Sequence, residues 1–332
     1  MYQTLSAYAE VCARAGRQEM GERLTALCRR IKDDFNRYLV KDGTVAGLVE
    51  LTASGVEHLL HPADRKTGVH YRLLPMTRGM LSGMFTPEQM QHHLALIDQH
   101  LLLPDGAHLM DLPMQYYGGT ERLFKRAETA ANFGREIGLQ YVHAHIRYVE
   151  AMAMIGRPDD AFAGLLQIIP IGLQDAVPSA LPRQSNAYFS SSDAAFCDRY
   201  EAREHFDRIR ALQVGVKGGW RIYSSGPGLV IGELISNILG LRDYYSDVVL
   251  DPVLPRSLDG LTFDFEYAGR PVRYLYHITE EGFSPRRVVI NGEAMAAIRH
   301  ARNPYRPGGM LIPRAEFVGA LDHKDNLVEI YI

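Results

Sequence analysis

Cysteine and tryptophan are scarce in this chain of 332 residues, which has three cysteines and one tryptophan. The cysteines, Cys12, Cys28 and Cys197, are odd in number and widely spaced, so they indicate neither a disulfide framework nor a zinc site. No run of 18 apolar residues occurs, and no basic segment followed by an apolar one stands at the N-terminus. These absences predict a soluble, cytoplasmic protein without a membrane span.

An excess of positive charge is also missing, because the formal net charge is -3. The charge balance therefore gives no electrostatic reason to expect binding to nucleic acid or to an anionic membrane. Apolar residues make up 46% of the chain, which is enough for a substantial core. The length allows one large domain or two ordinary ones.

Helical periodicity dominates the first three quarters of the chain. Gly16 separates the first two helices, and Thr86 followed by Pro87 marks the start of a later one. Lys41-Asp42-Gly43 is a turn signal, after which residues 44–51 form a short apolar extension; residues 58–71 are predicted to be a polar loop. The predicted helices cover residues 2–15, 17–39, 75–84, 87–101, 120–136, 139–155, 159–169, 201–212 and 229–241.

After Leu241 the period changes from about 3.6 to 2, which predicts strands. One of these runs places Phe263, Phe265 and Tyr267 on the same face of its strand. The predicted strands are 248–250, 261–267, 272–278, 287–290 and 327–332, with turns at Asp259-Gly260, Gly269-Arg270 and Asn291-Gly292. Because helices and strands are segregated along the chain, we expect two modules, residues 1–244 and 245–332.

A stretch rich in glycine and serine, Lys217–Gly228, contains the only tryptophan and leads into the last predicted helix. Glycines allow a ligand to approach the backbone closely, and the first turn of a helix offers unpaired N–H groups, so the stretch suits an anion. The alternative is structural: Ser224 or Ser225 caps the helix, with Pro227 in its first turn. Arg135–His143 and the polar loop Tyr188–Asp193 also lie at helix junctions, where a toroid presents its loops.

Several long motifs together resemble the glycoside phosphorylases of glycoside hydrolase family 94, and within that family the 1,2-β-oligoglucan-type branch. The motifs occur in the same order as in the family and extend over most of the chain. They are Gly118-Gly119, Phe124–Glu128, Gly134–Tyr141, His143–Tyr148 and Gly218–Gly228.

The resemblance implies a mostly α fold with a C-terminal β module. Family members have an (α/α)6 barrel, or α/α toroid, which follows a large β-sandwich domain and precedes a small β domain. Residues 1–244 are then the C-terminal portion of the barrel. Residues 245–332 are the C-terminal β domain, like a β-sandwich or jelly roll.

The resemblance also implies a reaction. Family members cleave a β-glucoside with inorganic phosphate, invert the anomeric carbon and release an α-sugar 1-phosphate. They need no cofactor, because phosphate is a co-substrate and acts as the nucleophile, while one carboxylic acid protonates the departing oxygen. The implied partners are a β-glucan oligosaccharide, phosphate and the upstream half of the same enzyme; a homodimer is compatible with this description.

Individual residues acquire roles through the same resemblance. His143 stands where members have a phosphate-binding histidine at the start of a barrel helix. Ser224 and Ser225 replace a Thr-Gly pair that also contacts phosphate, so the glycine is lost at position 225. We expect the sugar to be bound by Arg135, Glu136 and Ser192. His143 and His145 are two residues apart on a helix and diverge by about 200°, which argues against a shared metal ion.

One departure concerns catalysis itself. The family's general acid is an aspartate in a Trp- and Asp-containing motif, and the single tryptophan here is followed by arginine. We therefore expect no catalytic residue in this chain, and whether it has an activity of its own stays open. The alternatives are an inactive truncated remnant, a carbohydrate-binding module or, less well supported by the motifs, an α/α-toroid hydrolase. The spacing of Glu128 fits a solvated helix face, with a position turned toward the site as the alternative. Asp111 lies in a loop rich in glycine and proline and could line the cleft, but nothing marks it as an acid catalyst.

Overall fold

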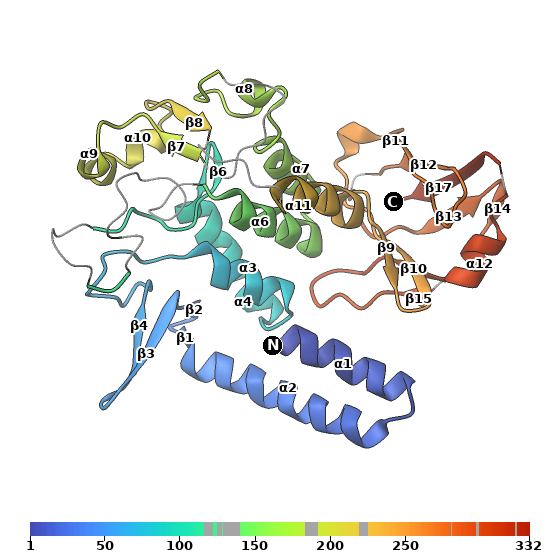
Figure 1. The fold of residues 1–332 in the computed structure, drawn as a ribbon, viewed down its shortest axis with the longest axis horizontal. Coiled ribbons are helices and arrows are strands. Elements are labelled where there is room, and N and C mark those ends of the chain that lie inside the picture. Colours follow the sequence, from blue (N-terminus) through green and yellow to red (C-terminus); the bar gives the residue numbers. More distant parts are fainter. Residues whose placement is uncertain are drawn as a thin grey trace. The chain divides into compact units, whose positions relative to one another are not determined.

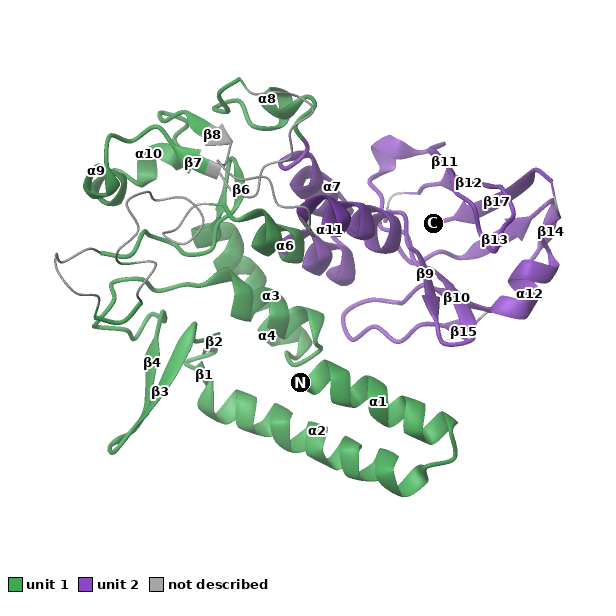
Figure 2. Cartoon of the chain, viewed as in Figure 1, with its two compact units in different colours: residues 1–147, 170–222 green, residues 148–169, 223–332 purple. Residues whose placement is uncertain are grey.

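The structure is a computed structural model. It describes residues 1–115, 122–124, 128, 140–182, 192–218, 225–279, 281–296, 299–322 and 324–332. Two compact units are present (Figure 2): unit 1 comprises residues 1–147 and 170–222, and unit 2 comprises residues 148–169 and 223–332. The border between the units falls inside helix α6 (Val142–Ile155). The division into domains 1–244 and 245–332 stays a prediction.

Unit 1 begins with two helices packed against one another, α1 (Tyr2–Arg14) and α2 (Gln18–Tyr38) (Figure 1). Cys12 and Cys28 are buried, which agrees with their reading as small apolar residues of helical stripes. The predicted helices at 2–15 and 17–39 are thereby confirmed.

Two small hairpins and two helices follow. The predicted turn at residues 41–43 joins β1 (Val40–Lys41) to β2 (Thr44–Val45). The second hairpin was not predicted, because its strands were read as an extension and part of a loop. The segments are β3 (Leu48–Thr52), β4 (Gly55–Leu59), α3 (Leu73–Leu81) and α4 (Pro87–Leu96), which continues as the π-helix η1 (Ile97–Leu101).

The remainder of unit 1 consists of short elements around a small apolar core. The predicted helix at 201–212 is divided into two pieces, and the predicted helix at 120–136 lies mostly outside the described residues. The elements are β5 (Leu102–Leu103), β6 (Gly106–Ala107), α8 (Leu173–Ala176), β7 (Ser192–Ala194), α9 (Arg199–Glu204), α10 (Asp207–Arg210) and β8 (Val216–Gly218). The core cluster consists of Leu103, Ala194, Phe196, Ala202, Phe206, Ile209 and Val214.

The helices of unit 2 are the second half of α6, α7 (Pro158–Leu166) and α11 (Ser225–Glu233), which continues as the π-helix η3 (Leu234–Ile238). The predicted helix 229–241 therefore begins four residues earlier than expected and ends before Leu241. Gly240 has φ 75, and a Cβ at this position would lie 2.1 Å from the backbone nitrogen of Pro252, so only glycine fits. Leu241 instead begins a strand.

Two sheets make up the C-terminal part of unit 2. The four-stranded antiparallel sheet has the order β15-β16-β10-β9, and the five-stranded sheet has the order β11-β12-β17-β13-β14, in which only β12 and β17 are parallel. The strands are β9 (Leu241–Tyr244), β10 (Asp247–Leu250), β11 (Thr262–Asp264), β12 (Val272–His277), β13 (Arg287–Ile290), β14 (Glu293–Ala294), β15 (Arg299–His300), β16 (Met310–Pro313) and β17 (Asn326–Tyr331). A 3-10 turn, η4 (Arg256–Leu258), and helix α12 (Arg314–Gly319) complete the unit.

The long strands alternate between buried and more exposed residues, as expected for a sheet with one covered face. Buried residues of the five-stranded sheet include Val272, Tyr274, Tyr276, Val288, Ile290, Val328 and Ile330. The predicted turn at Asn291-Gly292 joins β13 to β14, with φ values of 51 and 88. Phe263 of β11 and Phe265, just after it, stack with ring centroids 5.3 Å apart, as predicted. The strand is shorter than predicted, and Tyr267 lies beyond it and packs edge-on against Phe317.

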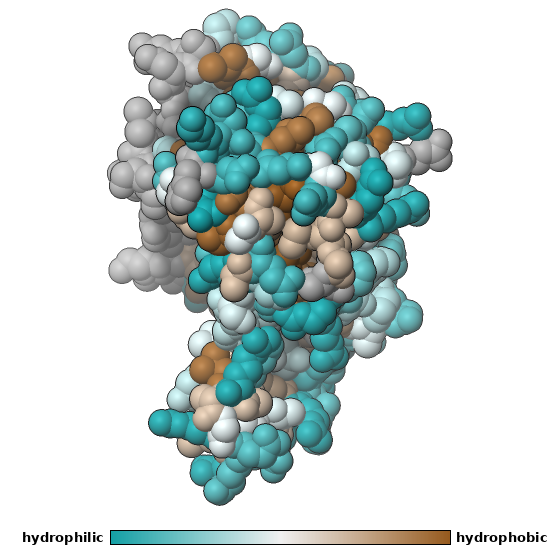
Figure 3. Space-filling model, turned by 90° about the vertical axis from the view of Figure 1, so that its right-hand side faces the viewer, coloured by the Kyte–Doolittle hydropathy of each residue, from teal (hydrophilic) through white to brown (hydrophobic). Residues whose placement is uncertain are grey.

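The surface drawn in Figure 3 carries mostly hydrophilic residues around a smaller band of apolar ones. Strand and loop residues of unit 2 that expose apolar side chains include Phe265, 40% exposed, and Leu327, 37% exposed. Within the described residues, no helix is long and apolar enough to cross a membrane.

Candidate phosphate-binding elements

The predicted site residues lie on separate elements. His143 is in the first turn of α6, the backbone of Ser192 begins β7, and the backbone of Ser225 begins α11. Arg135, Glu136 and Ser224 lie outside the described residues. The convergence of His143 with Ser224 and Ser225 on one anion therefore stays a prediction.

A buried set of polar contacts fixes the start of α6. The Nε2 of Gln140 donates a hydrogen bond to the carbonyl of Asp105 at 2.6 Å, and the Nδ1 of His145 accepts one from the amide of Ala107 at 2.9 Å. His108 pairs with the carboxylate of Asp105 at 2.6 Å, and both side chains are buried. The residues between β5 and β6, and β6 itself, thus hold the first turn of the helix in place.

Gly106 makes this close approach possible. Its φ is 119, and a Cβ would lie 2.5 Å from the Nε2 of Gln140 and 2.8 Å from the Cε1 of His145. Any side chain at this position would therefore displace the residues that fix the start of α6.

His143 has a different environment from His145, two residues further along the helix. His145 is fully buried, whereas His143 is half-buried and its ring stacks on that of Tyr141, with centroids 5.1 Å apart and an interplanar angle of 23°. The amides of Ala144 and His145 both donate to the carbonyl of Tyr141 at 2.9 Å. The helix dipole favours negative charge at this end, so an imidazole here suits an anion such as phosphate.

The side chain of Glu128 is engaged with the backbone of residues 122–124. Its carboxylate accepts hydrogen bonds from the amides of Arg122, Leu123 and Phe124 at 2.6, 2.7 and 2.6 Å, and its side chain is buried. Burial alone would raise the pKa of this carboxyl, but the three amides outweigh it and hold the pKa below its usual value. A carboxylate engaged in this way is a poor proton donor.

Two further side chains, those of Arg199 and Asp111, hold backbone groups in the same way. The sequence did not predict a structural role for either residue. Arg199 is buried and donates to the carbonyls of Glu128 and Met114 at 2.5 and 2.9 Å. Asp111 accepts from the amides of His70 and Tyr71 at 3.0 and 3.1 Å. These contacts give Asp111, like Glu128, a structural role, because each carboxylate holds backbone amides.

The helix that follows the glycine-serine stretch has little packed against one side. Apart from the chain neighbours and the backbone of the helix itself, no described atom lies within 4 Å of where a Cβ would stand on Gly228 or Gly232, which are one turn apart in α11. The helix contains Pro227 in its first turn, as the capping interpretation predicted. The choice between a cap and an anion contact depends on side chains outside the described residues.

Comparison with known proteins gives two related enzymes. Over 298 residues the chain is 43% identical to a 1,2-beta-oligoglucan phosphorylase of Listeria innocua, covering 89% of this chain and 27% of that protein. Over 315 residues it is 25% identical to a 3-O-beta-D-glucopyranosyl-beta-D-glucuronide phosphorylase of Paenibacillus borealis, covering 92% of this chain and 36% of that protein. The chain thus spans between about a quarter and about a third of the length of these relatives.

The last part of the chain matches a defined family. Residues 240–331, which contain both sheets of unit 2, correspond to the family described as "Glycoside phosphorylase C-terminal domain". The identity with the Listeria innocua enzyme extends well beyond this segment, over most of the helical part as well. Residues 240–331 therefore belong to the family of glycoside phosphorylase C-terminal domains, and the chain as a whole is similar to a C-terminal part of such an enzyme.

Proposed function

We propose that this chain supplies the phosphate-binding part of an inverting glycoside phosphorylase. The enzyme would cleave β-glucosides, of the β-1,2-glucan or cellobiose type, with inorganic phosphate to give α-glucose 1-phosphate. The observation that carries this proposal is the 43% identity with a 1,2-beta-oligoglucan phosphorylase over 89% of the chain.

The proposed fold follows from the same relationship. Residues 1–244 would form the later helices of an (α/α)6 barrel, and residues 245–332 a small β domain. In support, the longer helices all lie before residue 239, whereas the four- and five-stranded sheets lie after residue 240.

In the proposed site, His143 and the serines at 224 and 225 bind phosphate, while Arg135, Glu136 and Ser192 bind the sugar. The half-buried position of His143 in the first turn of α6 supports its role, because an imidazole N–H at the positive end of a helix can donate to an anion. The engagement of Glu128 and Asp111 with backbone amides supports placing the acid elsewhere.

The reaction needs a general acid, which we propose comes from the upstream half of the enzyme. This carboxylic acid donates its proton to the glycosidic oxygen, and the bond from that oxygen to C1 of the sugar breaks. An oxygen of phosphate attacks C1 from the opposite face and forms the new bond, so a β-glucoside becomes an α-sugar 1-phosphate. The oligosaccharide shortened by one glucose leaves with the donated proton.

The test compares two histidine variants in this chain joined to the upstream half of the enzyme. His143→Ala should raise the KM for phosphate by about tenfold to a hundredfold, because a hydrogen bond to a charged group contributes about 1.5–3 kcal/mol. The KM for the gluco-oligosaccharide should change less than about twofold. His205→Ala removes another half-buried histidine of unit 1 and is the matched control.

A change in the KM for the oligosaccharide alone would contradict the phosphate role of His143. The competing function is a carbohydrate-binding module that catalyses no reaction. It predicts that the joined protein binds gluco-oligosaccharide but releases no sugar 1-phosphate. Calorimetric titration with the oligosaccharide and an assay of released sugar 1-phosphate separate the two functions.

A further inference from the structure

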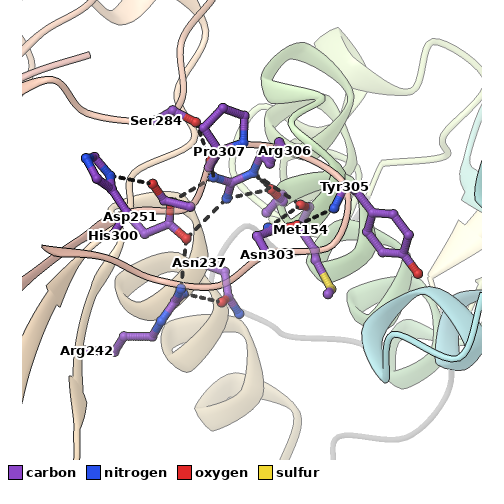
Figure 4. Close-up of polar contacts among 12 residues, drawn as sticks. Met154, Asn237, Arg242, Asp251, Ser284, His300, Asn303, Tyr305, Arg306 and Pro307 are labelled. Carbon is purple, nitrogen blue, oxygen red and sulfur yellow. Dashed lines mark hydrogen bonds and ion pairs between the residues drawn. The ribbon is translucent and has the colours of Figure 1, made fainter. Parts of the chain in front are cut away.

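Asp251, just after β10, lies between two guanidinium groups (Figure 4). Its Oδ1 is 2.8 Å from Nη1 of Arg306 and its Oδ2 is 2.8 Å from Nη2 of Arg242. The Asp251 and Arg306 side chains are each 4% exposed, and that of Arg242 is 35% exposed. A second contact, from Nη2 of Arg306 to Oδ2 at 3.2 Å, makes the buried pair bidentate.

Arg306 also binds the C-terminal end of α6. Its Nε donates to the carbonyl of Met154 at 3.1 Å, and its Nη2 to that of Ala153 at 3.2 Å. Asn303, on the same loop, donates to the Met154 carbonyl at 2.9 Å. The last carbonyls of a helix have no partner within it, so these donors cap α6 and fix its end.

Arg242 makes the equivalent connection to the helix formed by α11 and η3. Its Nη1 donates to the carbonyl of Ser236 at 2.9 Å and to the Oδ1 of Asn237 at 3.1 Å. Both residues belong to η3, the C-terminal turn of this helix. Asp251 therefore joins, through one arginine each, the C-terminal ends of two helices that are far apart in the sequence, and all these contacts lie within unit 2.

The opposite ends of the same helices carry the proposed phosphate ligands. His143 is in the first turn of α6, and Ser225 begins α11. Each helix is about 20 Å long, so a tilt of about 5° at one end moves the other by about 2 Å. Displacements of about 1 Å are enough to impair a site that positions reacting groups.

We propose that Asp251 is a positioning residue of the phosphate site. It joins the C-terminal ends of α6 and η3 through the two arginines, so a change at Asp251 is transmitted along each helix to its own first turn. This inference rests on the proposed function, because it assumes that those first turns bind phosphate.

The test uses Asp251→Asn, which keeps the shape of the side chain and removes its charge. Asp247→Asn is the matched control, because Asp247 is also a buried carboxylate of this sheet, paired with Arg299 at 2.6 Å, and none of its described contacts reaches either helix. Breaking a buried pair destabilises a protein, so both variants should lose thermal stability. Arg242→Gln, whose native side chain is partly exposed, is a milder variant that tests the η3 connection if Asp251→Asn does not fold.

Two readouts separate positioning from stability. In the 332-residue chain, hydrogen exchange should accelerate at the last turns of both α6 and η3 in Asp251→Asn, and in neither helix in Asp247→Asn. In the chain joined to the upstream half, Asp251→Asn should raise the KM for inorganic phosphate about tenfold, with the oligosaccharide KM within about twofold. Asp247→Asn should leave both constants within about twofold.

Equal exchange patterns in the two asparagine variants would overturn the inference, as would an unchanged phosphate KM in Asp251→Asn. His143→Ala distinguishes this failure from that of the proposed function. If His143→Ala raises the phosphate KM and Asp251→Asn does not, the phosphate site stands and Asp251 is only structural. If Asp251→Asn raises the phosphate KM and His143→Ala does not, the positioning role of Asp251 is supported and the proposed role of His143 is wrong.

Discussion

His93 is fully buried in α4 and makes two hydrogen bonds with the backbone. Its Nε2 accepts from the amide of Val45 at 3.0 Å, so its Nδ1 carries the proton and donates to the carbonyl of Gln89 at 2.7 Å. One face of the ring stacks on Phe85, with centroids 4.2 Å apart. Burial lowers the pKa of His93 to about 4, which keeps the imidazole neutral.

This lowered pKa predicts that the protein loses stability in mild acid. Between pH 6.5 and about 4, the unfolded chain binds a proton at His93 that the folded chain excludes, so the free energy of unfolding falls as the pH falls. The loss approaches about 1.4 kcal/mol per pH unit, or about 2 kcal/mol between pH 6.5 and 5. Urea unfolding at pH 7 and pH 5 measures it.

The controls are two glutamine variants of adjacent histidines. His93→Gln should be less stable than the wild type at pH 7 but should lose about 2 kcal/mol less on acidification. His92→Gln, which changes an exposed side chain, should keep the wild-type pH dependence. The same slope in all three proteins would show that His93 is not the group responsible.

At the scale of single residues, the sequence reveals motifs but not partners. His143 could be proposed because it stands in a long motif. Asp251 and Arg306 could not, because their contact spans 55 positions and neither residue belongs to a periodic pattern. The three hydrogen bonds from backbone amides to Glu128 could not be predicted either, since nearly every residue has a backbone N–H and the sequence does not show which of them bind a side chain.

At the scale of an element, the start of α4 shows how a few residues in sequence fix where a helix begins. Thr86 Oγ1 accepts from the amide of Gln89 at 3.2 Å, and Gln89 Oε1 accepts from the amide of Thr86 at 3.0 Å. This reciprocal capping box satisfies two backbone donors, and Pro87 occupies the first helical position. The predicted helix start was therefore right to the residue.

Thr86→Ala should destabilise the protein by about 1 kcal/mol, because the amide of Gln89 loses its acceptor. Thr86→Ser keeps the hydroxyl and should cost much less. The comparison requires urea unfolding at a fixed pH of 7. A Thr86→Ser variant as unstable as Thr86→Ala would instead assign the effect to the packing of the threonine methyl group.

Long periodic elements were predictable, and short ones were not. The two N-terminal helices and strands β12, β13 and β17 carry enough repeats of their period to be identified. Strands β14 and β15 have two residues each, and only their pairing partners define them. The continuation of the last predicted helix through Leu241 was wrong because apolar periodicity outweighed the stop signal of Gly240.

For the whole molecule, the family was predictable from the sequence, whereas the barrel stays a proposal. Family membership depends on residue identities in order along the chain, which a sequence contains directly. Closure of an (α/α)6 barrel depends on contacts between helices distant in sequence, and local periodicity does not encode these. The chain also spans only 27% of the length of the Listeria innocua relative, so most of such an enzyme lies in other sequence.

The proposed function places the general acid outside this chain, so we expect the purified 332 residues to release no sugar 1-phosphate from β-1,2-gluco-oligosaccharides and phosphate. The chain has no Trp-Asp motif, and its buried Glu128 and its Asp111 are both engaged with backbone amides. Without a positioned acid the glycosidic oxygen must leave unprotonated, a loss of about two to four orders of magnitude in rate. Joining the chain to the upstream half should restore the activity, and His143→Ala in the joined protein controls for contaminating phosphorylase. Release of sugar 1-phosphate by the chain alone, at a rate that His143→Ala reduces, would place a catalytic acid within these 332 residues.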